Sequence, residues 1–476
     1  MEHSRKNSWK ALRKKWQAVS PKERMKLAAK LGLRIVGIRK CLFLGGYREE
    51  EDLYQMQQDQ KIYEHLCAEI QKKDFSFEQQ DIPSDKYIAL MTENLDAGGL
   101  EEVVRLLAEE YMARGILVRV FCAREGGRIE RELAGKGIQT VVFHGEKESF
   151  IDYLEKHPPC LINTHYVQSF MKEMSELGIP VVEVIHNMYV FLTEKQLRAE
   201  HEKAQYISAY IAVSQKAKEV YQAKIPAAYG KEITVIGNCG KIMTNEKNDY
   251  RNNQTEMRKK YDIPQNAFVL ACVGSVDARK NQVGILRAWD IVKRMGVPEA
   301  CLVFVGKSTD AVYEKKVREV IEQRKLEDSV KILGQCNEIA RLLDAVDAVI
   351  IDSYYEGWSM AATEALYKGL PILHADCGSG AELVAGGQNG YLTGMVIKNM
   401  LAMTAVQLND AMQAGVNENI EETAAAMWDV MTNRADWAAR RMEIRQYAIR
   451  NFSTEKMIAG YLEVYHKVIR KASDKK

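Results

Sequence analysis

The sequence predicts two doubly wound α/β domains that face each other across a cleft, with a helical extension before them and a helical tail after them. A chain of 476 residues is too long for a single hydrophobic core. From residue 86 onward, short apolar runs alternate with helical patterns, as in parallel sheets covered by helices. The alternation pauses at the polar run 244–256 and then begins again, which indicates a linker between two domains.

The first 85 residues differ from the rest and are expected to form a basic and then acidic helical extension. Residues 1–48 hold 14 Lys or Arg and 2 Asp or Glu, whereas residues 49–85 hold 3 and 11. Trp9, Leu12 and Trp16 recur near helical spacing among basic residues, which indicates an amphipathic helix. Two interpretations stay open: a helix on an anionic membrane surface, and an extension packed on the protein body or on a partner. Nucleic-acid binding is a weaker alternative, and no nucleic acid is expected as a partner.

The composition is that of a globular protein without a membrane span. Apolar residues make up 46% of the chain and charged residues 28%, and no apolar run approaches the ~20 residues that a span needs. The start of the chain lacks the continuous apolar core of a secretory signal. Nine cysteines are scattered without a Cys-x-x-Cys pair, as in a reducing compartment. We expect a cytoplasmic protein, either free or peripheral on the inner face of the plasma membrane.

The first domain, residues 86–245, is expected to contain six strands with helices between them. Its clearest helical pattern spans residues 100–114 and follows the first strand. The predicted strands span residues 87–91, 117–122, 140–144, 160–164, 181–185 and 210–213.

The second domain, residues 255–450, repeats this pattern with five strands. The predicted strands span residues 268–273, 301–305, 330–333, 348–352 and 371–375, and the helices about 281–294, 311–324 and 358–368. Residues 397–472 have a helical pattern throughout, which predicts a helical tail that ends in residues 451–476.

In doubly wound sheets, ligands bind beyond the carboxyl ends of the strands, so the segments that follow strands hold the candidate site residues. Gly98 and Gly99 follow the first strand and open a helix. Glycines let a ligand approach the backbone closely, and the free amides of a helix start attract anions. A plain tight turn is the alternative. The full Gly-x-Gly-x-x-Gly fingerprint is missing, which disfavours a nicotinamide dinucleotide.

The segment 274–281 follows the first strand of the second domain and carries two cations. Arg279 and Lys280 would lie at the carboxyl edge of the sheet, a short distance after Ser275. Two cations there suit a diphosphate, because they can neutralise the charge of a leaving nucleotide. The alternative is a solvated surface pair.

A second segment of small residues follows the strand at 371–375 and opens another helix. It contains Gly378, Ser379, Gly380 and Ala381. Small side chains again permit backbone amides to approach an oxyanion, although this signal is weak by itself.

Two acids, Glu356 and Glu364, flank the start of the helix predicted at 358–368. Eight helical positions span roughly 12 Å. The carboxylates of glycoside hydrolases stand about 5 to 9.5 Å apart, so the spacing disfavours hydrolysis. It favours two acids that contact different parts of one long ligand, such as the sugar and the ribose of a nucleotide sugar. A surface acid is the alternative for Glu364.

Two histidines end strands of the first domain: His165 ends the strand at 160–164, and His186 the strand at 181–185. Strand ends are where the cleft is expected, which favours a functional role over a structural one. The two are not spaced as a metal site, and no metal is expected.

Taken together, these elements resemble glycosyltransferase family 4, the retaining enzymes of GT-B architecture. The resemblance covers residues 86–395 and a final helix near 453–470. The matching elements occur in the family's order: Gly98-Gly99, His165, Val213-Ser214, Asn238, Lys280, Gly306, Gly334, the Glu356 and Glu364 pair, residues 369–371, Glu382 and Asn389-Gly390. The resemblance implies an acceptor-side domain first, a nucleotide-sugar domain second, and a closing helix that crosses back to the first.

The resemblance also implies a role for each candidate residue. Glu364 would hold the nucleotide ribose, and Glu356 would lie beside the donor sugar. Arg279 and Lys280 would bind the diphosphate, and His165 would face the reacting centre; with Glu356 these form the expected catalytic set. The expected donor-binding set comprises Gly98, Gly99, Ser275, Gly357, Trp358, Ser359, Glu364, Gly378, Ser379, Gly380 and Ala381.

The chain departs from the family pattern in two places. Many members carry Arg where this chain has Ser275, which leaves more of the phosphate contact to Arg279 and Lys280. The Asn-Gly that commonly follows the inter-domain strand reads here as Gly237-Asn238-Cys239-Gly240.

By resemblance, the chain is expected to be a retaining glycosyltransferase that moves a sugar from a nucleotide-diphosphate donor, such as a UDP-sugar, to a saccharide or lipid-linked acceptor. Such a reaction serves cell-surface polysaccharide or glycolipid synthesis. The expected mechanism is front-side attack assisted by the leaving phosphate, with no cofactor and no metal. Two alternatives stay open: a sugar-nucleotide epimerase of the same architecture, and a non-catalytic protein that binds sugar nucleotides.

Overall fold

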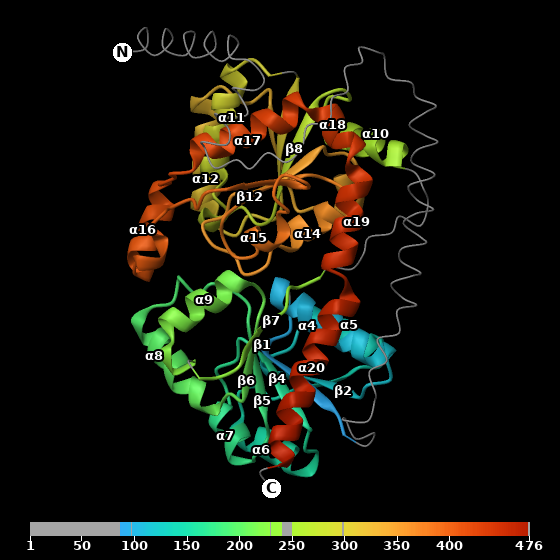
Figure 1. Ribbon diagram of the computed structural model, residues 1–476, viewed down its shortest axis with the longest axis vertical. Coiled ribbons are helices and arrows are strands. Elements are labelled where there is room, and N and C mark those ends of the chain that lie inside the picture. The colour runs from blue at the N-terminus through green and yellow to red at the C-terminus, as the bar shows by residue number, and fades with distance from the viewer. Residues whose placement is uncertain (1–85, 97, 229, 240–249, 298, 475–476) are drawn as a thin grey trace.

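Two α/β lobes make up the part of the chain that the computed structural model describes, which is residues 86–474 except 97, 229, 240–249 and 298. Figure 1 shows one lobe below the other, with the chain passing from blue and green in the first to yellow and orange in the second. The expectations for residues 1–85, including the amphipathic helix, lie outside the described residues. The predicted fold of two doubly wound domains with a helical tail is confirmed.

The first lobe is built on a seven-stranded parallel sheet with the order β3-β2-β1-β4-β5-β6-β7. Its strands are β1 Ile88–Asn94, β2 Val118–Glu125, β3 Gln139–Val142, β4 Leu161–His165, β5 Val181–Ile185, β6 Ala209–Ala212 and β7 Ile233–Val235. Its helices are α4 Gly99–Ala113, α5 Arg128–Gly135, α6 Lys147–Lys156, α7 Met171–Glu176, α8 Glu194–Lys203 and α9 Gln215–Lys224, with 3-10 turns η2 Ala204–Tyr206 and η3 Pro226–Ala228.

The second lobe has a six-stranded parallel sheet with the order β10-β9-β8-β11-β12-β13. Its strands are β8 Phe268–Val273, β9 Ala300–Val305, β10 Val330–Gly334, β11 Ala348–Ile351, β12 Ile372–Ala375 and β13 Gly390–Thr393. Its helices are α10 Tyr250–Lys260, α11 Gln282–Arg294, α12 Ala311–Gln323, α13 Ile339–Asp344, α14 Met360–Tyr367 and α15 Gly380–Leu383, with the 3-10 turn η4 Ala278–Lys280.

A helical tail follows the second sheet and ends in a long helix on the first lobe. The tail contains η5 Met400–Ala402, α16 Ala405–Ala414, α17 Ile420–Thr432, α18 Arg434–Ala439, α19 Arg441–Asn451 and α20 Thr454–Ser473. In Figure 1, α20 runs in red along the first lobe beside α4 and β6. Ser453 caps its start by accepting a hydrogen bond from the Lys456 amide. The long helix therefore ties the two lobes together.

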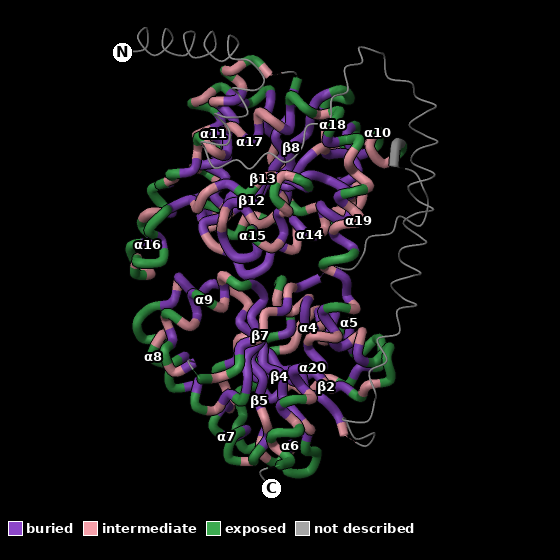
Figure 2. The backbone as a smooth tube through the Cα atoms, in the orientation of Figure 1, coloured by how far each residue is buried: buried purple, intermediate pink, exposed green. Residues whose placement is uncertain are grey.

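The strands are buried on both faces, as expected of parallel sheets covered by helices. Every residue of β4, β5, β9 and β11 is buried, and exposed residues lie mainly on the outer helices (Figure 2). Apolar side chains such as Val104 and Leu107 on α4 are fully buried against the sheet. The core of each lobe is therefore rigid enough to hold loops at its strand ends.

Each sheet reverses its strand order at one point, between β1 and β4 in the first lobe and between β8 and β11 in the second. A crevice opens where the connections from two neighbouring strands leave in opposite directions, and ligands bind in it. The loops after β1, β4, β8 and β11 are those that carried most of the candidate residues.

The structure corrects three details of the predicted elements. β7 and β13, of three and four residues, were missed. Residues 250–260, whose first part was expected to belong to the linker 244–256, form helix α10. The tail is helical but broken into five α-helices with short connections.

Candidate functional site

A cavity of about 410 Å³ lies between the two lobes, at the carboxyl ends of both sheets. This volume suits a small-molecule ligand. The first lobe lines it with Gly99, Leu100, Tyr166, His186, Asn187, Tyr189, Phe191 and Asn238, and the second with Arg279, Tyr355, Glu356, Gly357, Trp358 and Met360.

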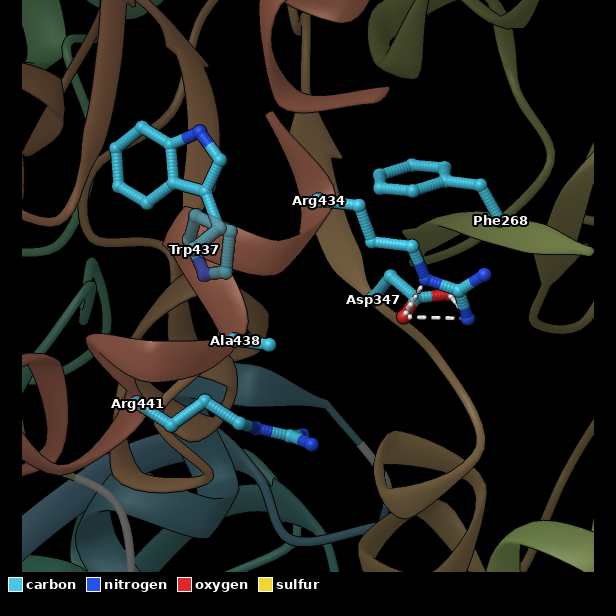
Figure 3. A pocket seen from close by; sticks show the side chains of 7 residues that line it. Phe268, Asp347, Arg434, Trp437, Ala438 and Arg441 are labelled. Carbon is cyan, nitrogen blue, oxygen red and sulfur yellow. Dashed lines mark hydrogen bonds and ion pairs between the residues drawn. The ribbon is translucent and has the colours of Figure 1, made fainter. Parts of the chain in front are cut away.

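A much smaller cavity, of about 20 Å³, lies at the opposite ends of the strands in the second lobe (Figure 3). It is lined by Phe268, Asp347 and Pro371, which begin or precede β8, β11 and β12. Arg434 points to Asp347 and forms an ion pair of 3.0 Å with it. A space of this size holds about one water molecule, so the cavity between the lobes is the candidate site.

Glu356 is one of the residues with which the second lobe lines the cavity. It follows β11, and its side chain is 8% exposed. Lys280 forms an ion pair with one carboxylate oxygen, and Arg279 Nη1 contacts the other at 3.1 Å. Ser353 Oγ donates a further hydrogen bond of 2.7 Å. The cations and the acid that the sequence singled out separately thus form one cluster.

The charges in this cluster keep Glu356 ionised. Burial by itself would raise the pKa of the carboxyl, but the attraction of Lys280 and Arg279 outweighs it and lowers the pKa to about 2. A carboxylate held in this way is a weak base near neutral pH. It can accept hydrogen bonds from hydroxyl groups but does not remove their protons.

The loop that carries the cations is held by its own polar residues. Asp277 accepts a hydrogen bond from the Lys280 amide at 3.2 Å, and the Ser275 hydroxyl also donates to Asp277. Asn281, which has a φ of 55°, donates to buried Asp352 at 2.8 Å. Ser275 is therefore placed as a support for the loop.

Glu364 lies in the second turn of α14 and is not among the residues that line the cavity. Burial, together with the charge of Glu102 on α4 of the first lobe, raises the pKa of its carboxyl to about 7. Its side chain has no hydrogen-bond or ion-pair partner among the described residues. A partly buried acid without a partner, between the lobes, is available to bind a ligand.

Of the two strand-end histidines, His186 lines the cavity and His165 does not. His165 is the last residue of β4 and is fully buried. Its Nδ1 lies 2.8 Å from His186 Nε2. The expectation that His165 faces the cleft is corrected: its side chain contacts His186, and it is His186 that lines the cavity.

Two expected donor-binding residues, Gly357 and Gly378, lie where the lobes are in contact. A Cβ at Gly357 would overlap the carbonyl oxygen of His186, and the Gly378 amide donates to Met188 Sδ at 3.3 Å. These contacts cross from one lobe to the other. Gly357 also lines the cavity, so the close approach of the lobes places this glycine at the ligand.

The remaining expected residues divide between the cavity and the local fold. Trp358 lines the cavity, and its indole N–H donates to Thr363 at 2.9 Å. Ser359 caps α14, and its amide donates to Ser379 Oγ at 3.0 Å. Gly99 lines the cavity, whereas Gly98, Gly380 and Ala381 do not.

The sequence reasoning missed an aromatic wall on the first lobe's side. Tyr166 and Tyr189 stack with ring centroids 5.4 Å apart, and Phe191 stacks on Tyr355 of the second lobe at 5.3 Å. Tyr166 and Tyr189 have φ values of 56° and 54°, a strained backbone for bulky residues. All four line the cavity. Their positions after strands were the signal that could have found them.

Both lobes match known family descriptions. Residues 97–239 match "Glycosyltransferase Family 4", and residues 253–405 match "Glycosyl transferases group 1". The chain belongs to the group 1 glycosyltransferases. Both family descriptions name the transfer of glycosyl groups.

Curated glycosyltransferases match over shorter stretches. The chain is 22% identical over 221 residues to N-acetyl-alpha-D-glucosaminyl L-malate synthase of Bacillus anthracis, 46% of this chain and 51% of that one. It is 28% identical over 189 residues to lipopolysaccharide 1,2-N-acetylglucosaminetransferase of Salmonella typhimurium, 38% of this chain and 47% of that one. The chain spans about half the length, or less, of the curated relatives that it matches.

Solved glycosyltransferase structures share the fold of this glycosyltransferase. Anabaena HepE, crystallised in complex with UDP, has a TM-score of 0.61 and 20% identity over 79% of this chain and 99% of that one. A glycosyltransferase from Rickettsia africae has a TM-score of 0.61 and 18% identity over 81% of this chain and 99% of that one. The GT-B architecture is thereby confirmed.

Two findings concern the described residues alone. None of the helices there is both long enough and apolar enough to cross a membrane. No group of three or more His, Cys, Asp and Glu side chains in that part of the glycosyltransferase is arranged to hold a metal ion.

Proposed function

We propose that this glycosyltransferase retains the anomeric configuration and transfers a sugar from a UDP-sugar to a saccharide or lipid-linked acceptor in cell-surface polysaccharide synthesis. The observation that carries the proposal is the cluster of Glu356, Arg279 and Lys280: Glu356 and Arg279 line the inter-lobe cavity, and Lys280 forms an ion pair with Glu356. The complexes of HepE with UDP and with UDP and glucose support the choice of base. The names of two relatives, both of which include lipopolysaccharide, support a cell-surface saccharide as the product.

In this proposal the diphosphate binds at Lys280 and Arg279. As the bond from C1 to the phosphate oxygen breaks, the β-phosphate gains negative charge, which the two cations stabilise. Glu356 keeps the cations oriented and accepts hydrogen bonds from the sugar hydroxyls. Glu364 accepts hydrogen bonds from the ribose diol. No metal or cofactor is part of this scheme, because two fixed cations supply the positive charge.

None of the residues that line the cavity is a competent base, which supports retention; Glu364, whose pKa is about 7, does not line the cavity and is assigned to the ribose. Glu356 is the single carboxylate among the residues that line the cavity within the described chain, and its pKa is about 2. Burial lowers the pKa of His186 to about 3. An inverting reaction needs a base that removes the acceptor proton, whereas front-side attack gives that proton to the leaving phosphate. The new bond at C1 then forms on the face that UDP leaves.

The acceptor is proposed to bind against the first lobe. Tyr166, Tyr189 and Phe191 offer apolar ring faces, and His186 and Asn187 offer polar groups beside them. A saccharide presents both apolar C–H faces and hydroxyl groups, and it fits such a wall. The carrier that brings the acceptor to the protein is proposed to be an anionic membrane, which the basic residues 1–48 would contact.

Two measurements test the proposal. A thermal-shift screen with UDP-, GDP- and ADP-sugars, with and without EDTA, should give stabilisation that is specific for UDP-sugars and unchanged by EDTA. Carbon-13 NMR of the product formed from a labelled UDP-sugar should show the donor's anomeric configuration. Stabilisation only by GDP- or ADP-sugars would contradict the choice of UDP. Loss of stabilisation in EDTA would contradict the metal-free scheme, and a product with the inverted configuration would contradict retention.

The membrane contact has its own test. The full-length chain should pellet with phosphatidylglycerol vesicles at low salt, and a chain that lacks residues 1–48 should stay in the supernatant. Phosphatidylcholine vesicles serve as the uncharged control. Equal pelleting of the full-length and the shortened chain would contradict membrane contact through residues 1–48 and would assign the contact to the rest of the chain.

A further inference from the structure

A chain of buried hydrogen bonds leads from the closing helix α20 to the cavity. The Tyr111 hydroxyl lies 3.2 Å from that of Tyr465, and the Tyr465 hydroxyl donates to Asn163 Oδ1 at 2.7 Å. Asn163 Oδ1 is also 3.0 Å from His165 Nε2. His165 Nδ1 lies 2.8 Å from Nε2 of His186, which lines the cavity.

The orientation of Asn163 fixes the direction of these bonds. Its side-chain Nδ2 donates to the Val182 carbonyl oxygen at 2.8 Å, so Oδ1 is the atom that faces His165 and Tyr465. An amide oxygen only accepts hydrogen bonds. His165 must therefore carry its proton on Nε2, and its Nδ1 is left as an acceptor.

The same logic fixes His186. A bare Nδ1 on His165 can only accept, so the proton of the 2.8 Å bond belongs to His186 Nε2. Burial lowers the pKa of both imidazoles, which keeps both rings neutral. A neutral ring with its proton on Nε2 has a bare Nδ1. Among the described residues, His186 Nδ1 has no partner and is not one of the buried unpaired atoms.

We propose that Asn163, His165 and Tyr465 are positioning residues that hold His186 in the tautomer whose Nδ1 only accepts hydrogen bonds. The proposal rests on the proposed function, in which a sugar hydroxyl meets His186 in the cavity. The site would then select a ligand group that donates a proton at this point. A hydroxyl meets this requirement, whereas a phosphate oxygen does not.

The surroundings of His165 leave its tautomer under the control of the hydrogen bonds that lead to it from Tyr465 through Asn163. The titratable group that contacts it is His186 after β5; the hydroxyl of Tyr465 on α20 lies beyond Asn163, and that of Tyr111 on α4 lies beyond Tyr465. The buried ion pairs of Lys203 lie elsewhere, because Thr164, which contacts Glu183, points to the other face of the sheet.

Nitrogen-15 NMR of the ligand-free protein tests the tautomer directly. The full-length chain would be labelled at its nine histidines, and the signals of the pair assigned by loss in His165→Phe and His186→Phe. We expect His186 in the Nε2–H form between pH 6 and 8. An Nδ1–H form, or an imidazolium in this range, overturns the proposal. This experiment needs no substrate, so it stands even if transfer from a UDP-sugar is never detected.

Asn163→Asp tests the consequence for function. The introduced carboxylate favours a charged His165, which donates from both nitrogens. His186 Nε2 must then accept, and its Nδ1 becomes a donor. We expect the kcat of the variant, relative to wild type at the same pH, to fall by about ten- to a hundredfold at low pH and to recover as pH rises. A ratio that does not change with pH overturns the proposal.

Tyr111→Phe is the matched control. It deletes one buried hydroxyl from the same cluster, but one that contacts only the outer end of the chain at Tyr465. We expect its kcat to stay within a few-fold of wild type at every pH and its His186 tautomer to be unchanged. A pH-dependent loss equal to that of Asn163→Asp would mean that packing, and not the tautomer, controls activity.

Discussion

Glu364 should make the affinity for the donor depend on pH. Burial and the nearby Glu102 raise the pKa of its carboxyl to about 7. Ribose hydroxyls donate hydrogen bonds to the ionised form, so binding must first release a proton when the carboxyl is protonated. With a pKa of about 7, roughly a tenth of the carboxyl is ionised at pH 6 and nine-tenths at pH 8. Donor affinity should therefore be about tenfold weaker at pH 6 than at pH 8, a difference of about 1.4 kcal/mol in binding free energy.

The measurement is calorimetric titration with UDP-glucose at pH 6, 7 and 8. UDP-glucose is preferable to UDP because its diphosphate carries no proton that titrates near neutral pH. Glu364→Gln keeps the size of the side chain but cannot ionise, so its affinity should be weaker at pH 8 and nearly constant across the range. Repeating the titration in buffers of different ionisation enthalpy should show proton release in wild type and none in the variant.

Stability gives an independent check with a definite sign. The folded pKa of Glu364 is above its unfolded value, so the stability that the protonated carboxyl contributes is fully present below about pH 4.5 and is lost as pH rises through about 7. Glu364→Gln should therefore match wild type near pH 4.5 and exceed it near pH 8. Asp352 also has a raised pKa of about 7, but it is present in both proteins and cancels in the comparison.

Two results would refute this reasoning. One is a wild-type affinity for UDP-glucose that is the same at pH 6 and pH 8. The other is a Glu364→Gln variant that keeps the tenfold slope, which would assign the titration to a different group.

Three further outcomes follow from single contacts. In a steady-state transfer assay, Lys280→Ala should lower kcat by about 10²- to 10³-fold, because it removes a cation that stabilises the leaving phosphate. The control Lys307→Ala, at an exposed lysine, should leave kcat unchanged. Lys203→Met should cost about 3–5 kcal/mol in urea unfolding, because it leaves two buried carboxylates unpaired; a loss below 1 kcal/mol would contradict this. Gly357→Ala should push the lobes apart, since its Cβ would overlap backbone across the cleft; small-angle scattering should show a larger radius of gyration, and an unchanged radius with full activity would argue against a closed working state.

The fold could be predicted from the periodicity of apolar residues, except in segments that are too short to show a period or whose buried side chains are polar. The long apolar strands were evident because both faces of a parallel sheet are covered. β13 is too short to show a period, since only Gly390 and Thr393 of its four residues are buried. The first part of α10 looked like linker because none of residues 252–256 is buried; further on, the helix is anchored by buried Arg258, whose guanidinium donates to the carbonyl oxygens of Gln265 and Ala267 at 2.6 and 2.9 Å. A buried arginine that bonds to backbone leaves no apolar pattern.

The charged cluster on the second lobe could be predicted better than the aromatic wall on the first. Lys280 and Glu356 follow strands and differ clearly from their apolar surroundings, so position and charge identified both. Their ion pair depends on how two loops meet, which spacing along the chain does not give. His165 and His186 looked equivalent, yet His165 is inside a strand and His186 is one residue beyond one. A side chain within a strand of a covered sheet points to a buried face, whereas one past its end can reach the cleft.

The proposed transfer requires the lobes to close, because the site is divided between them. The cations lie on the second lobe and His186 on the first, so a sugar nucleotide meets both only when the lobes approach as they do at Gly357. Among the described residues, the contacts across the cleft include the stacked rings of Phe191 and Tyr355 and two polar contacts: Lys216 pairs with Asp376, and the Gln215 amide donates to Glu382 at 2.6 Å. Such partly exposed pairs stabilise weakly, by about 1 kcal/mol or less each. The lobes can therefore separate to admit and release substrates, while α20 keeps them attached, and water is excluded from the diphosphate only during the closed interval in which an acceptor hydroxyl is present.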